Sequence, residues 1–277
     1  MAYKKILTIQ DISCVGQCSL TVALPILSAS GLETCILPSA VLSTHTAGFS
    51  GFTFRDLTDD MPQIQKHWQK ENIKFEAIYT GYLGSVKQVG YVRNILDTMG
   101  TENCVRIVDP AMADNGKLYS IFNDEYVAAM RTLCASADIL IPNITEACFL
   151  ADAEYREEYD EGYIKELLLK LAKLGSKTIV LTGVSYAPGK TGVIVYEDGS
   201  IRYYEHDKIS KGCHGTGDIY ASAFTGALMN GKEIFEAAKI AADYTVKCIV
   251  NTQGDADHWY GAKFETALGD LIEMLAK

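Results

Sequence analysis

The chain has 277 residues and a formal net charge of −10, from 25 Lys and Arg against 35 Asp and Glu. This negative charge opposes that of a phosphate backbone and argues against a broad nucleic-acid-binding surface. Hydrophobic residues make up 48% of the chain and charged residues 22%, a composition that excludes a disordered protein.

No apolar run approaches the roughly 20 residues that a membrane span requires, so we expect no membrane partner. The basic residues near the start precede an apolar stretch, residues 6–9, that is too short for a signal peptide. The eight cysteines include no Cys-x-x-Cys pair. Together these features favour reduced thiols and a cytoplasmic location.

Short strand-like runs alternate with helical patterns over the first two thirds of the chain. The predicted strands are residues 5–10, 34–38, 77–80, 105–109, 139–141 and 178–182. The predicted helices between them are residues 19–30, 62–71, 86–99, 124–134 and 162–174. This alternation predicts an α/β protein with βαβ crossovers and a largely parallel sheet covered by helices on both faces.

The pattern changes after Thr182. Residues 191–196 and 201–204 flank a Glu-Asp-Gly-Ser segment, which predicts a β-hairpin with a tight Asp-Gly turn. Further helices are predicted at residues 216–229, 232–251 and 263–275. No linker or repeat interrupts these elements, so we expect one domain over residues 1–277. The loop-rich stretch 42–60 is the expected cover over a site.

The strongest local motif is Lys-Gly-Cys-His-Gly-Thr-Gly-Asp at residues 211–218, followed by an apolar helix rich in small residues. Gly215 and Gly217 allow close approach of a ligand to backbone N–H groups at a helix N-terminus, where an anion binds well. Asp218 follows directly, so its carboxylate would stand beside the bound anion, where it could accept a proton from an attacking hydroxyl. The spacing is equally compatible with an Asp218 that only stabilises the start of the helix.

Other candidate motifs are weaker. Residues 183–191 resemble a P-loop but have five residues between the glycines instead of four, and they lead into the hairpin. No Gly-x-Gly-x-x-Gly follows the first strand, so a dinucleotide site lacks its anchor. Asp255, Asp257 and His258 are compatible with a metal cluster, although a polar loop is the plainer interpretation.

Several segments follow the strands in an order that resembles the ribokinase-like superfamily and, within it, the pyridoxal kinase branch. These segments are Ile9-Gln10, Ser43-Thr-His-Thr46, Thr80-Gly-Tyr-Leu-Gly-Ser85, Asp109-Pro110, Pro142-Asn-Ile-Thr-Glu146 and Gly215-Thr-Gly-Asp218. The resemblance extends from residue 5 to about residue 250. It implies a three-layer α/β/α ribokinase-like fold with a mostly parallel central sheet and a late β-hairpin.

The resemblance also implies ATP-dependent phosphorylation of the 5′-hydroxymethyl group of a B6 vitamer: pyridoxal, pyridoxamine or pyridoxine. Asp218 would be the general base, and the amides of Gly215, Thr216 and Gly217 would form the anion hole. The implied cofactors are ATP and Mg²⁺, with a role for K⁺ left open. A homodimer is expected, as is common in this family.

The remaining site residues are also implied by the resemblance. Glu146 and Asn143 would organise Mg²⁺ and the triphosphate, with Asp109 and Glu146 as the metal-site acids. The expected nucleotide-site residues are Asp109, Asp114, Tyr119, Asn143, Glu146, Thr182, Lys208 and Cys213. The expected substrate-site residues are Asp11, His45, Thr46, Tyr82 and Asp218. The alternative for Glu146 is a first-turn residue that complements the helix dipole.

Two departures from the family pattern affect specificity. Many pyridoxal kinases have serine at the position of Asp11, and a carboxylate there would favour a protonated ring nitrogen or the aminomethyl group of pyridoxamine. Cys213 and His214 resemble the related hydroxymethylpyrimidine kinases, whose turn often ends in cysteine, whereas here it ends in Asp218. The alternatives are therefore a hydroxymethylpyrimidine kinase of the same fold, or a non-catalytic B6- or nucleotide-binding protein.

Overall fold

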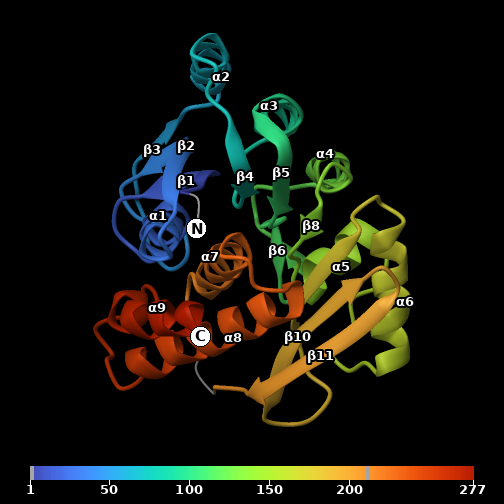
Figure 1. The fold of residues 1–277 in the computed structure, drawn as a ribbon. Helices are drawn as coiled ribbons and strands as arrows, with labels where there is room; N and C mark the ends of the chain where they lie inside the picture. Colours follow the sequence, from blue (N-terminus) through green and yellow to red (C-terminus); the bar gives the residue numbers. More distant parts are fainter. Residues whose placement is uncertain (1–2, 210–212) are drawn as a thin grey trace.

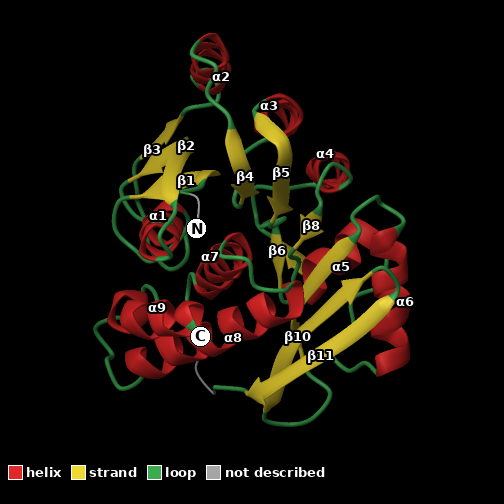
Figure 2. Cartoon of the chain, in the orientation of Figure 1, coloured by secondary structure: helices red, strands yellow, loops and turns green. Residues whose placement is uncertain are grey.

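The computed structural model describes residues 3–209 and 213–277, and its centre is a nine-stranded sheet (Figures 1 and 2). The strands lie in the order β11-β10-β9-β8-β5-β4-β1-β2-β3. Their bounds are β1 (Lys5–Ser13), β2 (Glu33–Leu42), β3 (Phe54–Asp56), β4 (Phe75–Thr80), β5 (Gly100–Val108), β8 (Ile139–Leu140), β9 (Thr178–Val184), β10 (Lys190–Glu197) and β11 (Ser200–Asp207). The strands from β9 to β2 pair in parallel, while β10, β11 and β3 are antiparallel to their neighbours. This confirms the predicted mostly parallel sheet with a late hairpin.

Helices cover both faces of the sheet, as Figure 1 shows. They are α1 (Leu20–Ala29), α2 (Met61–Lys70), α3 (Val86–Thr98), α4 (Asp124–Cys134), α5 (Ile144–Ala151), α6 (Glu161–Ala172), α7 (Thr216–Met229), α8 (Ile234–Thr252), the 3₁₀ helix η1 (Phe264–Ala267) and α9 (Leu268–Ala276). The core on one face includes α2 to α6, and the core on the other includes α1, α7, α8 and α9. The three-layer prediction is confirmed. Within the described ranges, every helix is too short or insufficiently apolar to cross a membrane.

Strand β1 shows why the sheet is covered on both faces. Ile6 joins the core on one face while Leu7 and Ile9 join the core on the other, and all three are fully buried. Successive side chains of a strand point to opposite faces, so a strand between two helical layers needs apolar residues at consecutive positions. The polar Asp11 comes at the carboxyl end of this apolar run. The strand therefore places a carboxyl group at the edge of the sheet where the parallel strands end.

Four segments differ from the predictions. Residues 144–151 form α5, which is absent from the predicted helices because only eight residues carry the helical pattern, although the alternative for Glu146 placed a first helical turn there. Part of the predicted loop 42–60 is strand β3, which pairs with residues 40–42 at the edge of the sheet. The helix predicted at residues 263–275 begins as η1 before it continues as α9. A small second sheet, β6 (Ala113–Asp114) with β7 (Lys117–Leu118), was also not predicted.

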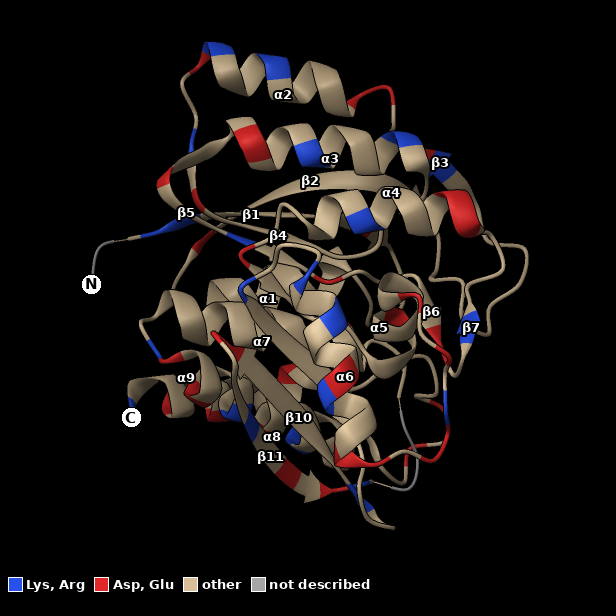
Figure 3. Ribbon diagram, turned by 90° about the vertical axis from the view of Figure 1, so that its right-hand side faces the viewer, with Lys and Arg blue, Asp and Glu red and all other residues tan. Residues whose placement is uncertain are grey.

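The surface charge agrees with the composition. On the side of the molecule in Figure 3, basic and acidic residues are interspersed along α3, α4 and α6. Such alternation does not form the continuous basic face that nucleic-acid binding requires.

Candidate active site

The N-terminus of α7 offers a cradle of backbone N–H groups. Gly215 precedes the helix with φ 76°, and a Cβ built there would lie 1.6 Å from the carbonyl oxygen of Gln17, so only glycine fits. A Cβ built at Gly217 would meet no atom within 4 Å, so the first turn borders open space. The N–H groups of a first helical turn have no acceptor within the helix. The geometry therefore suits an anion at this turn. Lys211 and Gly212, which open the motif, lie outside the described residues.

Asp218 lies in the first turn of α7 and is half-buried. Its Oδ2 accepts a hydrogen bond of 2.9 Å from the backbone N–H of Ser19, and α7 has no side-chain cap. Burial raises the pKa of Asp218 to about 7, the nearby Asp11 raises it too, and the Ser19 hydrogen bond lowers it. A carboxyl group with a pKa near neutral pH is well suited to accept a proton from an alcohol. No side chain caps α7, and Asp218 is an acid in its first turn, where it also complements the helix dipole.

Asp11 is 5% exposed at the end of β1, and its Oδ2 accepts a hydrogen bond of 3.0 Å from the Ser13 hydroxyl. Burial raises its pKa, while the hydrogen-bonding serines and the nearby His45 lower it. Tyr82 lies close enough to Asp11 that burial and this carboxylate together raise the pKa of the phenol to about 12. The structure thus brings together Asp11, Tyr82 and Asp218.

His45 is buried beside this group. Its Nδ1 accepts a hydrogen bond from the Ala47 N–H at 3.1 Å, and its Nε2 lies 2.7 Å from the carbonyl oxygen of Tyr260. The ring packs against Phe49 at 5.0 Å and His214 at 5.5 Å between ring centroids. Part of the predicted covering loop therefore lies beside Asp11, one of the expected substrate-site residues, whereas Thr46 is exposed and makes no hydrogen bond or ring contact with this group.

Asp109 and Glu146 form a second acidic group at the same edge of the sheet. Glu146 is 3% exposed, and its two oxygens accept hydrogen bonds from the N–H groups of Met112 and Asn143 at 3.2 and 2.9 Å. The Asn143 side chain accepts in return from the Glu146 N–H, so the pair forms a capping box for α5. The first-turn role considered for Glu146 is confirmed. Its position beside Asp109 is compatible with a metal role as well.

These acids fit a hydrated Mg²⁺. Burial and the proximity of Glu146 and Asp218 raise the pKa of Asp109, and burial raises that of Glu146 to about 8. Among the described residues, none donates a hydrogen bond to the Asp109 carboxylate, and no cluster of three or more side chains suited to a metal ion is found. Mg²⁺ is commonly held by one or two carboxylates together with water and phosphate, which is what this pair offers.

Most other predicted nucleotide-site residues surround this acidic group. Tyr119 is 40% exposed, and its pKa is raised by burial and by Glu146, Asp109 and Asp114. The Thr182 N–H donates to the carbonyl oxygen of Pro142 at 2.9 Å, which places β9 next to the start of α5. Lys208 is exposed, and its backbone N–H bonds to Gly189 in the hairpin, so the recorded contacts do not join it to the acidic group.

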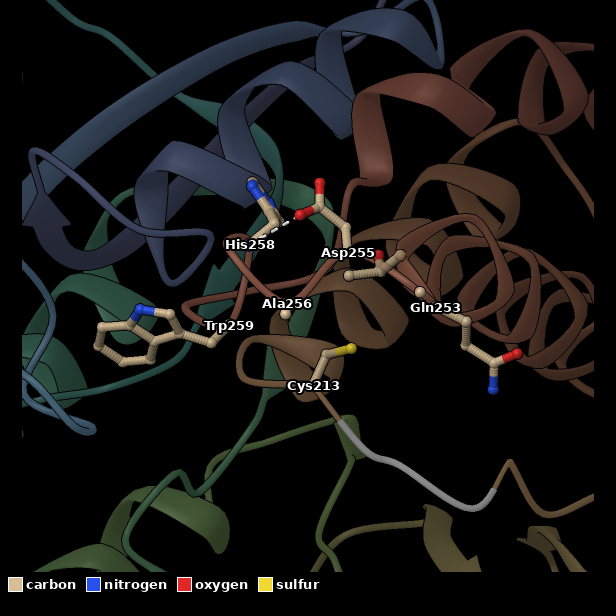
Figure 4. Close-up of a pocket in the computed structure, with 8 residues that line it drawn as sticks. Cys213, Gln253, Asp255, Ala256, His258 and Trp259 are labelled. Atoms are coloured by element: carbon tan, nitrogen blue, oxygen red, sulfur yellow. Dashed lines mark hydrogen bonds between the residues drawn. The ribbon is translucent and has the colours of Figure 1, made fainter.

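Cys213 lies at a cavity of about 170 Å³ beside the start of α7 (Figure 4). The other lining residues are Thr252, Gln253, Gly254, Asp255, Ala256, His258 and Trp259. Asp255 forms an ion pair with Lys263 and accepts a hydrogen bond from the His258 N–H, as expected of a polar loop. Ligand pockets usually measure about 300–1,000 Å³, so this cavity holds at most a part of a nucleotide.

Two contacts at the site have no signal in the local sequence. The Ser19 N–H reaches Asp218 across 199 residues of chain, and the Tyr260 carbonyl reaches His45 across 215. Both are backbone groups, which every residue carries. Only the fold reveals them.

Comparisons with known proteins fit this geometry. The family model described as phosphomethylpyrimidine kinase matches residues 26–261. The hydroxymethylpyrimidine/phosphomethylpyrimidine kinase of Bacillus subtilis is 27% identical over 220 residues, which cover 78% of this chain and 78% of that protein.

Two solved structures are similar over almost the whole chain. A Bacteroides thetaiotaomicron protein provisionally named a phosphomethylpyrimidine kinase, crystallised with pyridoxal, is 38% identical with a TM-score of 0.91, covering 97% of this chain and 96% of that chain. The pyridoxal kinase of Lactobacillus plantarum is 30% identical with a TM-score of 0.91, covering 98% and 97%. The relatives therefore include kinases named for either substrate class.

Proposed function

The chain belongs to the phosphomethylpyrimidine kinase family, and we propose that it transfers the γ-phosphoryl group of ATP to the 5′-hydroxymethyl group of a B6 vitamer. The observation that carries this proposal is the half-buried Asp218 beside the open amide cradle of residues 215–217. Asp11, Tyr82 and His45 line the same side, where a ring bearing the alcohol would bind.

The chain's own groups account for each part of the reaction. The oxygen of the alcohol forms a bond to the γ-phosphorus of ATP, and the bond from that phosphorus to the oxygen that leaves with ADP breaks. Asp218 accepts the proton that the alcohol loses. The N–H groups of Thr216 and Gly217 donate to the phosphoryl oxygens, which carry the transferred charge. Asp109 and Glu146 would hold a hydrated Mg²⁺. Bound Mg²⁺ would neutralise charge on the phosphates.

A B6 vitamer is favoured over hydroxymethylpyrimidine phosphate by two observations. The glycine-rich turn ends in Asp218 where the pyrimidine kinases it resembles often have cysteine. The 38% identical Bacteroides protein was crystallised with pyridoxal. The second candidate function, phosphorylation of hydroxymethylpyrimidine or its phosphate, is supported by the family match and the Bacillus relative.

A substrate panel with Mg²⁺-ATP tests the proposal. ADP release is measured with pyridoxal, pyridoxine, pyridoxamine, hydroxymethylpyrimidine and hydroxymethylpyrimidine phosphate. We expect the highest kcat/KM for a B6 vitamer. A highest value for either pyrimidine would establish the second candidate instead, and absence of turnover with all five would favour a binding protein without catalysis.

A further inference from the structure

Ser19 has a backbone conformation that L-residues rarely adopt. It is 5% exposed, with φ 55° and ψ −132°, and it directly precedes α1. A positive φ favours glycine because a Cβ crowds the backbone there. Such a conformation persists in a non-glycine residue only when the surrounding structure enforces it, and it is often found at functional sites.

Both backbone polar groups of Ser19 form hydrogen bonds. Its N–H donates to Oδ2 of Asp218 at 2.9 Å, and its carbonyl accepts from Val22 and Ala23 at the start of α1. A serine before a helix normally caps it with the hydroxyl, yet α1 has no side-chain cap. The hydroxyl lies instead near Asp11, where it lowers the pKa of that carboxyl group.

The surroundings of Ser19 hold this arrangement. An isolated antiparallel bridge joins Ser19 to Ile12 of β1. Two residues earlier, Gln17 packs against Gly215 and Gly261 so closely that a Cβ at either glycine would overlap it. The Gln17 side chain also donates to Glu265 at 2.8 Å. The loop before α1 is therefore fixed between β1, the start of α7 and the segment before η1.

We infer that Ser19 is a positioning residue: its N–H orients Asp218, and its place beside Asp11 keeps the two carboxyl groups at a fixed separation. This inference rests on the proposed function, in which Asp11 faces the substrate ring and Asp218 faces its alcohol. A fixed separation presents the alcohol to the base in one geometry, and small misplacements of reacting groups are costly in rate.

The titratable groups around Asp218 influence its pKa. Titratable groups from several elements lie near it: Asp11 of β1, Cys18 of the loop before α1, Tyr79 of β4, Asp109 after β5 and Tyr119 after β7. None of these five carries a positive charge. The Ser19 N–H therefore stabilises the ionised form of Asp218, and its displacement raises the pKa of that group.

Two substitutions separate the backbone role from the hydroxyl role. Ser19→Gly removes the hydroxyl but accepts φ 55°, so the N–H keeps its direction. Ser19→Ala keeps the Cβ that strains φ 55° but removes the hydroxyl near Asp11, so the backbone has one restraint fewer and relaxes away from φ 55°, which displaces the N–H. Ser28→Ala is the control, because Ser28 is exposed on the same helix.

We expect Ser19→Ala to lower kcat about tenfold to a hundredfold and to move the acid limb of kcat/KM up by about one pH unit. Ser19→Gly should raise KM for the vitamer and lose clearly less kcat than Ser19→Ala. Ser28→Ala should match the wild type. The inference would be overturned if Ser19→Ala kept a kcat within about twofold of the wild type and an acid limb within about 0.2 pH unit of it. These limits are about the precision of such profiles.

A second measurement does not depend on turnover. Carboxyl ¹³C NMR, with the signal assigned by its absence in Asp218→Asn, reports the protonation midpoint of Asp218 in each variant. We expect a higher midpoint in Ser19→Ala than in Ser19→Gly, and equal midpoints would reject the positioning role. If the wild type phosphorylates none of the panel alcohols, the proposed function fails while this titration still tests Ser19.

Discussion

Asp218 combines burial, one hydrogen bond from Ser19 and a neighbouring acid, Asp11, in a single side chain. Its pKa of about 7 means that the ionised form, which accepts a proton, becomes dominant as the pH rises through neutrality. The rate should therefore rise with pH along an acid limb centred near pH 7. The direction follows because burial favours the protonated acid.

Replacing Asp218 with Asn tests the assignment of the base. Asn keeps the shape and can still accept the Ser19 hydrogen bond, but it cannot take a proton. We expect kcat to fall by about 10²–10⁴, with KM for ATP little changed, and the acid limb to disappear. Asp97→Asn, an exposed change on α3, is the control. A turnover within a few-fold of the wild type would remove Asp218 from the mechanism.

Asp11 tests the choice between vitamers. It is a buried carboxylate whose neighbours on the substrate side, Tyr82 and His45, do not neutralise it as a lysine or arginine would. A substrate with a cationic nitrogen would supply the missing positive charge. We expect Asp11→Asn, which keeps the shape, to lower kcat/KM for pyridoxamine about tenfold relative to pyridoxal, and Asp11→Ser to do the same. An unchanged ranking of the three vitamers in both variants would reject this role.

The same residues show what a sequence can and cannot reveal. The spacing left the role of Asp218 open, whereas the amide turn at residues 215–217 was predictable, because glycines in a strict pattern before a helix have few other uses. The role of Ser19 was not, because its important group is a backbone N–H and its partner is 199 residues away. The metal-site roles of Asp109 and Glu146, the involvement of K⁺ and the homodimer stay predictions.

The strands and helices were likewise predicted only in part from the sequence. The strands that supply the site were predicted from continuous apolar runs, since a strand between two helical layers has no polar face. Helix α5 was absent from the predicted helices because it has only eight residues, although Asn143 and Glu146 stand at the spacing of a capping box and marked its start. Short helices depend on such tertiary and capping contacts more than on their own periodicity.

The start of α5 combines a helix cap with the proposed nucleotide site. Asn143 caps α5 through its Oδ1, and its Nδ2 donates to the Ala113 carbonyl at 2.9 Å, which fixes β6 beside the acidic group. Asn143→Ala should cost about 1 kcal/mol of unfolding free energy and raise KM for ATP several-fold. Thermal unfolding and initial-rate kinetics measure the two effects.

Asp160→Ala is the matched control for this prediction. Asp160 caps α6 by accepting from the Tyr163 N–H at 2.8 Å, and no recorded contact joins it to the acidic group. It should cost a similar unfolding free energy and leave KM for ATP unchanged. Equal effects of the two variants on KM would mean that Asn143 acts only through the stability of its helix.

The whole molecule carries an unusual concentration of acid at one edge of its sheet. Asp11, Asp109, Glu146 and Asp218 all have raised pKa values, with burial as the largest cause. In the described part of the chain, no lysine or arginine forms an ion pair with any of the four. A site built to bind a metal ion and phosphates tolerates this acidity because a cation offsets it when bound.

This acidity predicts how stability depends on pH. Each raised pKa means that the folded chain binds protons more tightly than the unfolded chain, whose carboxyl groups titrate near 4. The free energy of unfolding without Mg²⁺ should therefore fall as the pH rises from about 5 to 8, the window bounded above by the pKa of about 8 for Glu146 and about 7 for Asp218. Mg²⁺ should reduce the fall, since it favours the ionised acids.

Urea unfolding at pH 5, 6, 7 and 8, with and without Mg²⁺, measures this dependence. Glu146→Gln should flatten the profile because glutamine does not titrate, and it should weaken the effect of Mg²⁺. Glu166→Gln, an exposed change on α6, should keep the wild-type slope. If the free energy of unfolding of the wild type instead rises from about pH 5 to 8, ionisation of the four acids does not destabilise the fold, and the prediction is wrong.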